Sequence, residues 1–457
     1  MKADLPTISV AENLAARIAT LDAARLPASL RLKCDDLLVD VVGLCVTARN
    51  EDYVKAALSA LDDEGPCTAI GHDRKLSAAG AAFVNGTAAH GEDFDDTFEG
   101  GPVHAGAVIV PAVLAACERY GADGRAALLG IAVGCEVLCR LSLVAPKAVH
   151  RSGFHPTAVF GVMGAAAGVG ATLGLNNKQL VDALGVAGSM AGGIIEYLAE
   201  GAWTKRLHPG WAAQSGLRAA LLGRAGFFGP RTVFEGVHGL FNGFAHSALG
   251  DYGALTDDFG ERWAIETLAF KPYPCGTMAH PYIDCARRLA ARGVSADDIR
   301  EIVCEVAEGT VHRLWEPLAA KQRPPNDYAA KFSTPFLIAA GFVRGNVGLD
   351  AFTETAVNDQ RVLALAGKIR FEIDPDNPYP HNYTGHLRAA MNDGSVVEER
   401  QPHLRGGAKE PLTRKDIEDK FRLNARHGGW PAERAQTALQ LMHALYDGPV
   451  TLEALRG

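Results

Sequence analysis

An almost uninterrupted apolar run in the first half of the chain, Ala158–Leu175, constrains the fold more than any other feature. Only Thr172 is polar among its 18 residues, and ten of them are glycine or alanine. Residues this small gain little on transfer into lipid, and a membrane-spanning helix needs about 20 strongly apolar residues. Small residues do let helices approach one another closely. The run therefore predicts a helix buried at the centre of a helical domain, and no membrane span.

Helical periodicity extends over about the first 265 residues, with little sign of strands. Apolar residues recur at spacings of three and four, and small residues such as Gly161, Ala165, Gly168 and Ala171 share one predicted helix face. Such faces suit tight contact between helices in a central layer. We expect a mainly α protein, with helices in this part at 10–21, 28–46, 76–89, 103–120, 124–144, 158–173, 177–191 and 212–224.

Strand-like patterns begin only after Tyr273-Pro274. Four short β-branched or alternating runs cover residues 300–307, 368–373, 387–391 and 395–399, and Asp393-Gly394 is a hairpin turn signal between the last two. Predicted helices at 281–292 and 328–340 would cover this sheet, and helices return at 414–423 and 432–446. The sequence therefore predicts a large all-helical domain, residues 1–268 completed by 403–457, and a smaller inserted α+β domain, residues 269–402.

Net charge and cysteine spacing argue against nucleic-acid binding and against disulfide or zinc sites. The chain has 45 Lys and Arg against 53 Asp and Glu, a formal net charge of −8, whereas a nucleic-acid-binding surface normally shows a basic excess. The nine cysteines form no CxxC pair, which favours buried reduced thiols over disulfides or zinc. The first residues carry no apolar stretch typical of a secretion signal. We therefore expect a cytoplasmic protein with no nucleic-acid or membrane partner.

The densest chemical pattern runs from Asn85 to His104. Five carboxylates lie within the eight residues Glu92–Glu99, flanked by His90 and His104. Packed carboxylates repel one another unless protons or cations intervene. This acidic cluster is therefore solvated, metal-bound or functional.

Several interpretations of the acidic cluster remain open from the residues alone. An exposed acidic loop is the plainest one. The DxDxT pattern of Asp93, Asp95 and Thr97 resembles the first motif of haloacid-dehalogenase-type phosphatases, but no apolar strand precedes it. The DxDD pattern ending at Asp96 resembles class II terpene cyclases, but only 7% of the chain is aromatic. Oxygen ligands would also suit magnesium, yet nearby basic residues favour cations supplied by the protein itself.

Four cationic positions punctuate the apolar sequence: His104, His155, Lys205 and Lys271. The two histidines lie at the starts of predicted helices, where partial positive charge and free N–H groups favour an anion. Lys271 falls at the predicted domain junction, and domain interfaces are common ligand sites. Together these residues predict one anion-binding cleft. A polyanionic carboxylate fits them better than phosphate, because the chain has no Walker loop and no GxGxxG after a predicted strand.

With these motifs the chain resembles the MmgE/PrpD family, which includes 2-methylcitrate dehydratase, cis-aconitate decarboxylase and iminodisuccinate epimerase. The matching blocks keep the family's order and cover much of the chain. They are Asn85-Gly-x-x-x-His90 with Asp93-Phe-Asp-Asp-Thr97 and His104, Gly153-Phe-His-Pro156, Thr204-Lys205-x-x-His208-x-Gly210, Phe270-Lys271-Pro-Tyr-Pro274 and Ala330-Lys331-Phe332-Ser333.

The resemblance implies a large helical domain, a smaller α+β lid, a homodimer, and a pocket between the domains that uses no cofactor and no metal. In this scheme His104 is the acid/base, and His155 is an anion binder or second proton donor. Asp93 holds a histidine's tautomer or raises its pKa, and the lysines neutralise an enediolate-like dianion. Carried over motif by motif, the resemblance implies the catalytic residues Asp93, His104, His155, Lys205 and Lys271 and the substrate-binding residues Thr97, His208 and His280.

The resemblance also implies chemistry that begins or ends with a proton on a carbon next to a carboxylate. We expect a cofactor-independent lyase, a dehydratase or decarboxylase of a small di- or tricarboxylate such as a 2-methylcitrate- or cis-aconitate-like acid. Two departures from the family pattern weaken the transfer of 2-methylcitrate in particular: Gly276-Thr277-Met278 after Cys275, and Glu99-Gly100-Gly101 before His104. The alternatives are an epimerase of an iminodisuccinate-like dicarboxylate and a non-catalytic carboxylate-binding protein.

Overall fold

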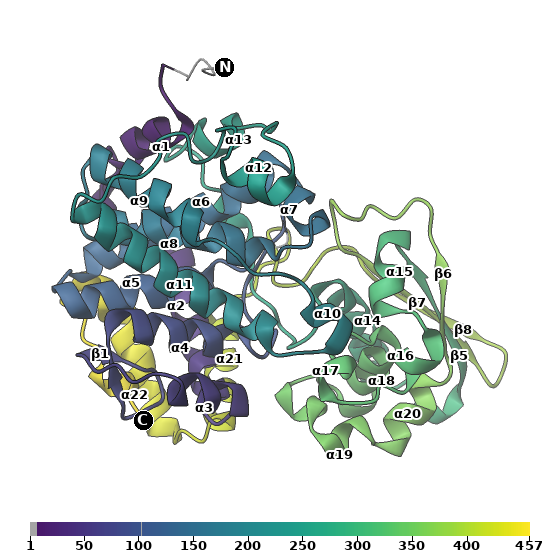
Figure 1. Cartoon of the computed structure of the whole chain (residues 1–457). Helices are drawn as coiled ribbons and strands as arrows, with labels where there is room; N and C mark the ends of the chain where they lie inside the picture. The colour runs from purple at the N-terminus through teal and green to yellow at the C-terminus, as the bar shows by residue number, and fades with distance from the viewer. Residues whose placement is uncertain (1–6, 102) are drawn as a thin grey trace. The chain divides into compact units, whose positions relative to one another are not determined.

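The computed structural model describes residues 7–101 and 103–457, and the chain divides into two compact units (Figure 1). The first, which we call the helical unit, comprises residues 1–268 together with Thr413–Gly457. The second, which we call the mixed unit, comprises Ala269–Leu412. Helices dominate both units and strands are few, so the expectation of a mainly α protein is confirmed.

The helical unit contains long helices and several short ones, with four two-residue strands, of which β1 pairs with β2 and β4 ends at the first residue of the mixed unit. Its helices and strands are α1 (Val10–Ile18), α2 (Ala28–Ala48), α3 (Asp52–Ser59), β1 (Cys67–Thr68), β2 (Lys75–Leu76), α4 (Ala78–His90), β3 (Thr97–Phe98), α5 (Gly106–Tyr120), α6 (Gly124–Val144), α7 (Ala148–Arg151), α8 (Pro156–Thr172), α9 (Asn177–Met190), α10 (Tyr197–Glu200), α11 (Thr204–Arg224), α12 (Leu240–Ala245), α13 (Gly253–Thr256), β4 (Leu268–Ala269), α21 (Arg414–His427) and α22 (Ala432–Ala444).

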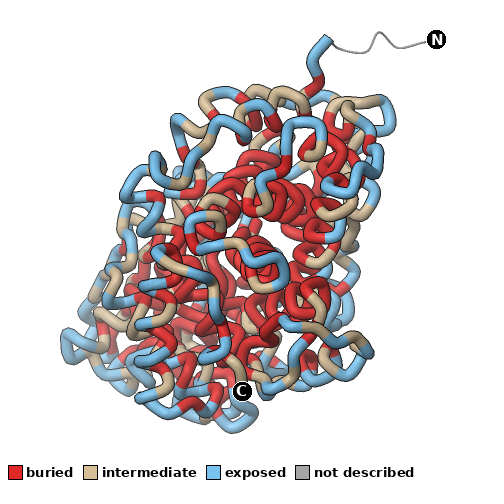
Figure 2. Tube along the Cα trace, turned by 90° about the vertical axis from the view of Figure 1, so that its left-hand side faces the viewer, coloured by how far each residue is buried: buried red, intermediate tan, exposed pale blue. Residues whose placement is uncertain are grey.

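Helix α8 is the buried centre that the apolar run predicts. Every residue from Pro156 to Gly170 is buried, and Figure 2 shows buried helical segments inside with exposed positions around them. On one side α8 packs on α6, where a Cβ on Gly168 would lie 2.6 Å from the carbonyl oxygen of Gly130. On another side it packs on α11, where a Cβ on Gly216 would lie 2.4 Å from that of Ala165. The predicted small-residue face therefore serves two partner helices.

One helix among the described residues, α6, is long and apolar enough to cross a membrane. In this structure 89% of the most apolar 18-residue stretch of α6 is buried inside the protein. The helix lies against α5 and α8 and is capped at its start by the side chain of Asp123. Burial of this extent is typical of a core helix, which has the same composition as a membrane span.

The mixed unit is a four-stranded sheet with helices packed on one face. The strand order is β6-β5-β7-β8, with β5 and β6 parallel and the other two pairs antiparallel. The predicted hairpin is confirmed, because Asp393 and Gly394 connect β7 to β8 and Gly394 has a φ of +89°. Its elements are α14 (His280–Ala291), β5 (Ile299–Val306), α15 (Glu308–Leu314), α16 (Leu318–Gln322), α17 (Asp327–Ala330), α18 (Thr334–Arg344), α19 (Glu354–Val357), α20 (Gln360–Ala366), β6 (Ile369–Ile373), β7 (Gly385–Met391) and β8 (Val396–Gln401).

Alternation along the strands separates the core of the mixed unit from its polar face. Ile302 and Cys304 of β5 and Leu387 of β7 are fully buried and join the core formed with α14 and α18. The opposite face carries polar residues, for example His386 of β7, whose Nδ1 lies 2.6 Å from the Glu305 carboxylate. The expectation that this unit acts as a lid stays a prediction.

The largest difference from the predicted helices is the start of α11, which lies at Thr204 rather than at residue 212. Pro209 argues against a helix here because it removes a backbone donor. Close packing on α4 overrides it, since a Cβ on Gly210 would lie 2.1 Å from the carbonyl oxygen of Phe83. A smaller difference is the predicted helix 328–340, which is two helices, α17 and α18, with Pro335 in the first turn of the second.

The close α6–α8 contact predicts a marked loss of stability for Gly168→Ala. The new methyl group would meet a backbone carbonyl that cannot rotate away, so we expect unfolding free energy to fall by about 1–3 kcal/mol in urea titrations. Gly243→Ala is the matched control, because Gly243 is an exposed position of α12 and its Cβ would meet no atom within 4 Å. Equal stability of the two variants would contradict the packing described here.

Candidate active site

The acidic cluster lies in the helical unit, in the loop between α4 and β3, and its centre is buried. Asp93, Asp95 and Asp96 are at most 4% exposed, so the interpretation as an exposed acidic loop is wrong. Asp93 pairs with Lys205 of α11. Asp95 pairs with His90 at the end of α4, and Asp96 accepts backbone N–H groups. The donors and cations thus come from the protein itself, as the nearby basic residues indicated.

Asp96 fixes the start of α5. Its two carboxylate oxygens accept the backbone N–H groups of Ala105 and Gly106, each at 2.9 Å. A carboxylate here satisfies donors that the helix leaves open and meets the positive end of the helix dipole. Burial, with the charges of Asp95 and Asp40, nevertheless raises the pKa of Asp96 to about 8. The helix start that the sequence offered to a ligand anion is occupied by a protein carboxyl group instead.

The C-terminal segment holds the acidic loop from a third direction. The ammonium of Lys420, on α21, donates to the carbonyl oxygen of Phe94 at 2.7 Å and lies 3.9 Å from the Phe94 ring centroid. It also lies 2.7 Å from the carboxylate of Asp40, a buried residue of α2. Because all three groups are buried, the loop geometry depends on helices from both ends of the chain.

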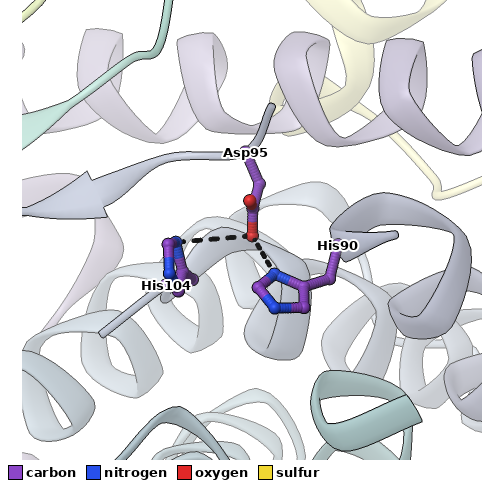
Figure 3. A group of neighbouring side chains, drawn as sticks. All are labelled: His90, Asp95 and His104. Atoms are coloured by element: carbon purple, nitrogen blue, oxygen red, sulfur yellow. Dashed lines mark hydrogen bonds and ion pairs between the residues drawn. The ribbon is translucent and has the colours of Figure 1, made fainter. Parts of the chain in front are cut away.

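His90, Asp95 and His104 lie at the centre of the site (Figure 3). The Oδ2 atom of Asp95 is 2.6 Å from Nδ1 of His90 and 3.6 Å from Nδ1 of His104. Nδ1 of His104 is also 2.7 Å from the carbonyl oxygen of Asp96 and 3.4 Å from the Thr97 hydroxyl. A carbonyl oxygen only accepts, so Nδ1 of His104 carries a proton and Nε2 has the lone pair when the ring is neutral.

Asp95 therefore pairs with a histidine, the role that the resemblance gave to Asp93. The carboxylate of Asp93 pairs with the ammonium of Lys205, and its predicted role beside a histidine stays a prediction. Its backbone is in the left-handed region, with a φ of +55°. A non-glycine residue in that region is uncommon and is held there by its surroundings. The ion pair with Lys205 is one such restraint.

Beside the group of His90, Asp95 and His104, two further histidines, His155 and His208, form an imidazole pair. Their Nδ1 atoms are 3.0 Å apart, so one donates a proton and the other must accept it. Burial, followed by the charges of neighbouring histidines and Lys205, holds the pKa of His155 well below its usual range. Burial, with His90 and Lys205, lowers the pKa of His208 to about 4. Both rings are therefore neutral at pH 7 and share one proton between the two Nδ1 atoms.

The early start of α11 brings Lys205 and His208 into the site. They lie three residues apart on the first turns of the helix, so both face the same side. His155 is the N-cap residue of α8, and its backbone N–H donates to the carbonyl oxygen of Gly193 at 2.8 Å. Starts of α5, α8 and α11 thus meet around the acidic loop.

Four imidazole rings converge in this arrangement. The ring centroid of His90 is 4.9 Å from that of His104 and 5.9 Å from that of His155. The centroids of His104 and His155 are 6.4 Å apart, and His155 is 5.2 Å from His208. A largely buried group of rings with a nearby ammonium can bind an anion and move a proton beside it.

A surface pocket of about 540 Å³ adjoins the His155–His208 pair. Its walls include His208, Tyr197 and Gly193, together with the half-exposed side chain of Trp211. The Tyr197 ring packs edge-on against both His155 and His208, at 6.2 and 5.8 Å between centroids. The pocket offers a small molecule access to one side of the site.

Among the described residues, His90, Asp95 and His104 have ligand atoms within 4.8 Å of one another and could hold a metal ion. However, the Nδ1 atoms of both histidines, which face Asp95, already donate hydrogen bonds. Nδ1 of His104 needs its proton for the Asp96 carbonyl, and Nδ1 of His90 points at the Asp95 carboxylate. A nitrogen that carries a proton has no lone pair for a metal. The geometry fits a proton network better than a metal centre.

Lys271 and His280, two further predicted site residues, lie in the mixed unit. Lys271 is 3% exposed and follows β4. His280, at the start of α14, is fully buried; its Nε2 lies 3.2 Å from the carbonyl oxygen of Cys275, and its ring packs edge-on against Tyr273. Whether these two residues join the histidines of the helical unit stays a prediction.

The structure adds two site residues that sequence reasoning did not assign, His90 and Asp95. Both were visible in the acidic cluster, but five carboxylates in eight residues gave no means of matching each one to a partner. The five-residue spacing across the end of α4 is the signal, because it lets a side chain in the following loop reach back to the last turn.

In a comparison with known proteins, the two units match the two domains of one protein family. The MmgE/PrpD N-terminal domain matches residues 12–249, and the MmgE/PrpD C-terminal domain matches residues 273–445. The chain is 31% identical to cis-aconitate decarboxylase of Mus musculus over 369 residues, 77% of this chain and 73% of that protein. It is 30% identical to cis-aconitate decarboxylase of Homo sapiens over 371 residues, 77% and 74% of the two chains. It is 27% identical to cis-aconitate decarboxylase-like protein oryM of Aspergillus oryzae over 441 residues, 91% and 90% of the two chains.

The His155–His208 pair predicts that His208 stays neutral far below the usual histidine range. Its folded pKa is near 4 against 6.5 in an unfolded chain, so protons favour the unfolded state as pH falls from 6.5 to 4. NMR titration of histidine-labelled protein, with His208 assigned by its loss in His208→Asn, should show no midpoint above pH 5. A midpoint near 6.5 would contradict the buried pair.

Proposed function

The chain belongs to the MmgE/PrpD family, and we propose that it is a cofactor-independent lyase that acts on a small di- or tricarboxylate. The observation that carries the proposal is the convergence of four imidazoles and the Lys205–Asp93 pair inside the helical unit. The names of its relatives support decarboxylation of a cis-aconitate-like acid, and dehydration of a citrate-like acid would use the same groups.

Electrostatic stabilisation is the first requirement of such chemistry. Lyase reactions next to a carboxylate build up an enediolate-like dianion, and a fixed cation in a buried site lowers its energy. Lys205 supplies that charge: its side chain is only 13% exposed, and Asp93 occupies one direction of an ammonium that has three donors. In this proposal Lys271 of the mixed unit is a second cation, and the mixed unit closes over the substrate.

Proton transfer is the second requirement. We assign it to Nε2 of His104, because its Nδ1–H donates to the Asp96 carbonyl. In a dehydration, this base takes the proton beside the carboxylate while the hydroxyl group leaves with a proton from a second donor. In a decarboxylation, the electron pair of the broken C–C bond is taken up by a proton delivered to carbon. Asp95 stabilises the imidazolium, and the second donor is the N–H that the neutral His155–His208 pair holds besides the proton shared between its Nδ1 atoms.

An epimerase of a dicarboxylate is the second candidate, and one observation favours it. His104 and the His155–His208 pair are separate proton carriers, with His104 and His155 centroids 6.4 Å apart. Removal of a proton by one carrier and return by the other would invert a carbon centre. The proposal also includes a homodimer in the cytoplasm, which rests on the family likeness and on the sequence.

The proposed function predicts turnover by EDTA-treated protein without added metal or cofactor. Cis-aconitate-like, citrate-like and tartrate-like acids should be assayed in D₂O for CO₂ release, alkene absorbance and deuterium incorporation. We expect CO₂ release or alkene formation with at least one acid at an unchanged rate after EDTA treatment. Exchange without net product would identify the epimerase instead. Absence of both turnover and exchange with every acid would contradict the proposal.

Lys205→Ala separates catalysis from binding alone. Loss of a fixed charge at a developing dianion typically costs on the order of 10²- to 10³-fold in kcat, so turnover should fall by that factor. Lys178→Ala is the control, because Lys178 is a largely exposed lysine in an ion pair within α9. If an acid raises the Tm but neither the wild-type protein nor either variant converts it, the chain is a non-catalytic carboxylate-binding protein.

A further inference from the structure

We propose that His90, backed by Asp95, contacts the bound carboxylate through its Nε2 atom. The inference rests on the proposed function and adds to it a residue that lies outside the predicted site. It follows from the burial of the ring, the bond that orients it, and the lack of a hydrogen-bond partner for its second nitrogen within residues 7–101 and 103–457.

The ring of His90 is completely shielded from solvent, with a side-chain exposure of 0%. Its Nδ1 donates to the Asp95 carboxylate at 2.6 Å, which fixes the tautomer and the ring orientation. Figure 3 shows the other ring nitrogen pointing away from Asp95. A carboxylate that orients an imidazole in this way also stabilises its protonated form.

Nε2 of His90 is buried and has no hydrogen-bond partner among the described residues. A buried polar atom without a partner destabilises a fold. The same ring lies beside His104 and His155, the two predicted proton carriers. A ligand oxygen at this position would supply the missing partner in the place where the chemistry is proposed to occur.

The charge balance of the pair suits a carboxylate. With Asp95 ionised and His90 protonated the pair is neutral, and Nε2–H can donate to an anionic oxygen without adding net charge to the buried site. If His90 were only a packing residue, an amide that keeps the Asp95 bond would replace it without effect on ligand binding.

Two isosteric substitutions separate these roles. In His90→Asn the side-chain amide occupies the place of Nδ1, so it keeps the bond to Asp95 and has no atom at Nε2. In His90→Gln the amide reaches the place of Nε2 and loses the bond to Asp95. The exposed His427 of α21, changed to Asn, is the matched control.

The experiment measures the Kd of cis-aconitate for the full-length proteins by calorimetry, with Tm in the absence of ligand as a check on folding. A lost bond to an anion predicts a roughly 10- to 100-fold weaker Kd for His90→Asn, with affinity partly retained by His90→Gln. His427→Asn should bind like wild type. Binding by His90→Asn within twofold of wild type would overturn the inference.

A second measurement covers the case in which His90→Asn does not fold. In histidine-labelled wild-type protein, the ¹⁵N signal of His90 Nε2, identified by its loss in His90→Gln, should shift when cis-aconitate is added. An unchanged signal at saturating ligand would overturn the inference.

The two proposals fail separately in these experiments. Turnover by wild type with an unaffected His90→Asn would reject the role of His90 and leave the lyase in place. If the wild-type protein binds an acid tightly but does not convert it, and His90→Asn binds that acid more weakly, the lyase proposal is rejected and the contact between His90 and the carboxylate is supported. A wild-type protein that neither binds nor converts any of the acids would overturn both.

Discussion

Burial of the acidic loop is the constraint on which the rest of the helical unit depends. Three aspartates that are at most 4% exposed can remain inside a protein only if donors or cations meet them. Lys205 of α11, His90 of α4 and the first N–H groups of α5 provide these partners. Because each partner lies on a different helix, satisfying the carboxylates also fixes how those helices meet.

The small residues of the sequence make that arrangement possible. Glycines in α6, α8 and α11 bring the helix backbones so close that a methyl group would clash. Close packing of this kind leaves little freedom for sliding, so the helix starts that carry His155 and Lys205 have defined positions. The same apolar helices exclude water, which strengthens charge interactions between the imidazoles and the lysine. The fold thus places a polar proton network inside an otherwise apolar unit.

The sequence predicted the parts that depend on local pattern and missed those that depend on tertiary contact. The buried centre at α8 and the hairpin at Asp393-Gly394 follow from periodicity and turn chemistry and are confirmed. The start of α11 did not follow, because packing of Gly210 on α4 outweighs the proline beside it. Nor could spacing pair Phe94 with Lys420, since 326 residues separate them. The position of Lys271 relative to the histidines stays a prediction.

The most direct test of the account is a crystal structure of the full chain with cis-aconitate or a related polycarboxylate bound. The account predicts ligand carboxylate oxygens within about 3.2 Å of the Lys205 ammonium and of ring nitrogens in the histidine cluster, with the acidic loop still held by Lys420. A ligand bound away from the helix starts, with Lys205 and the histidines facing protein groups alone, would contradict it.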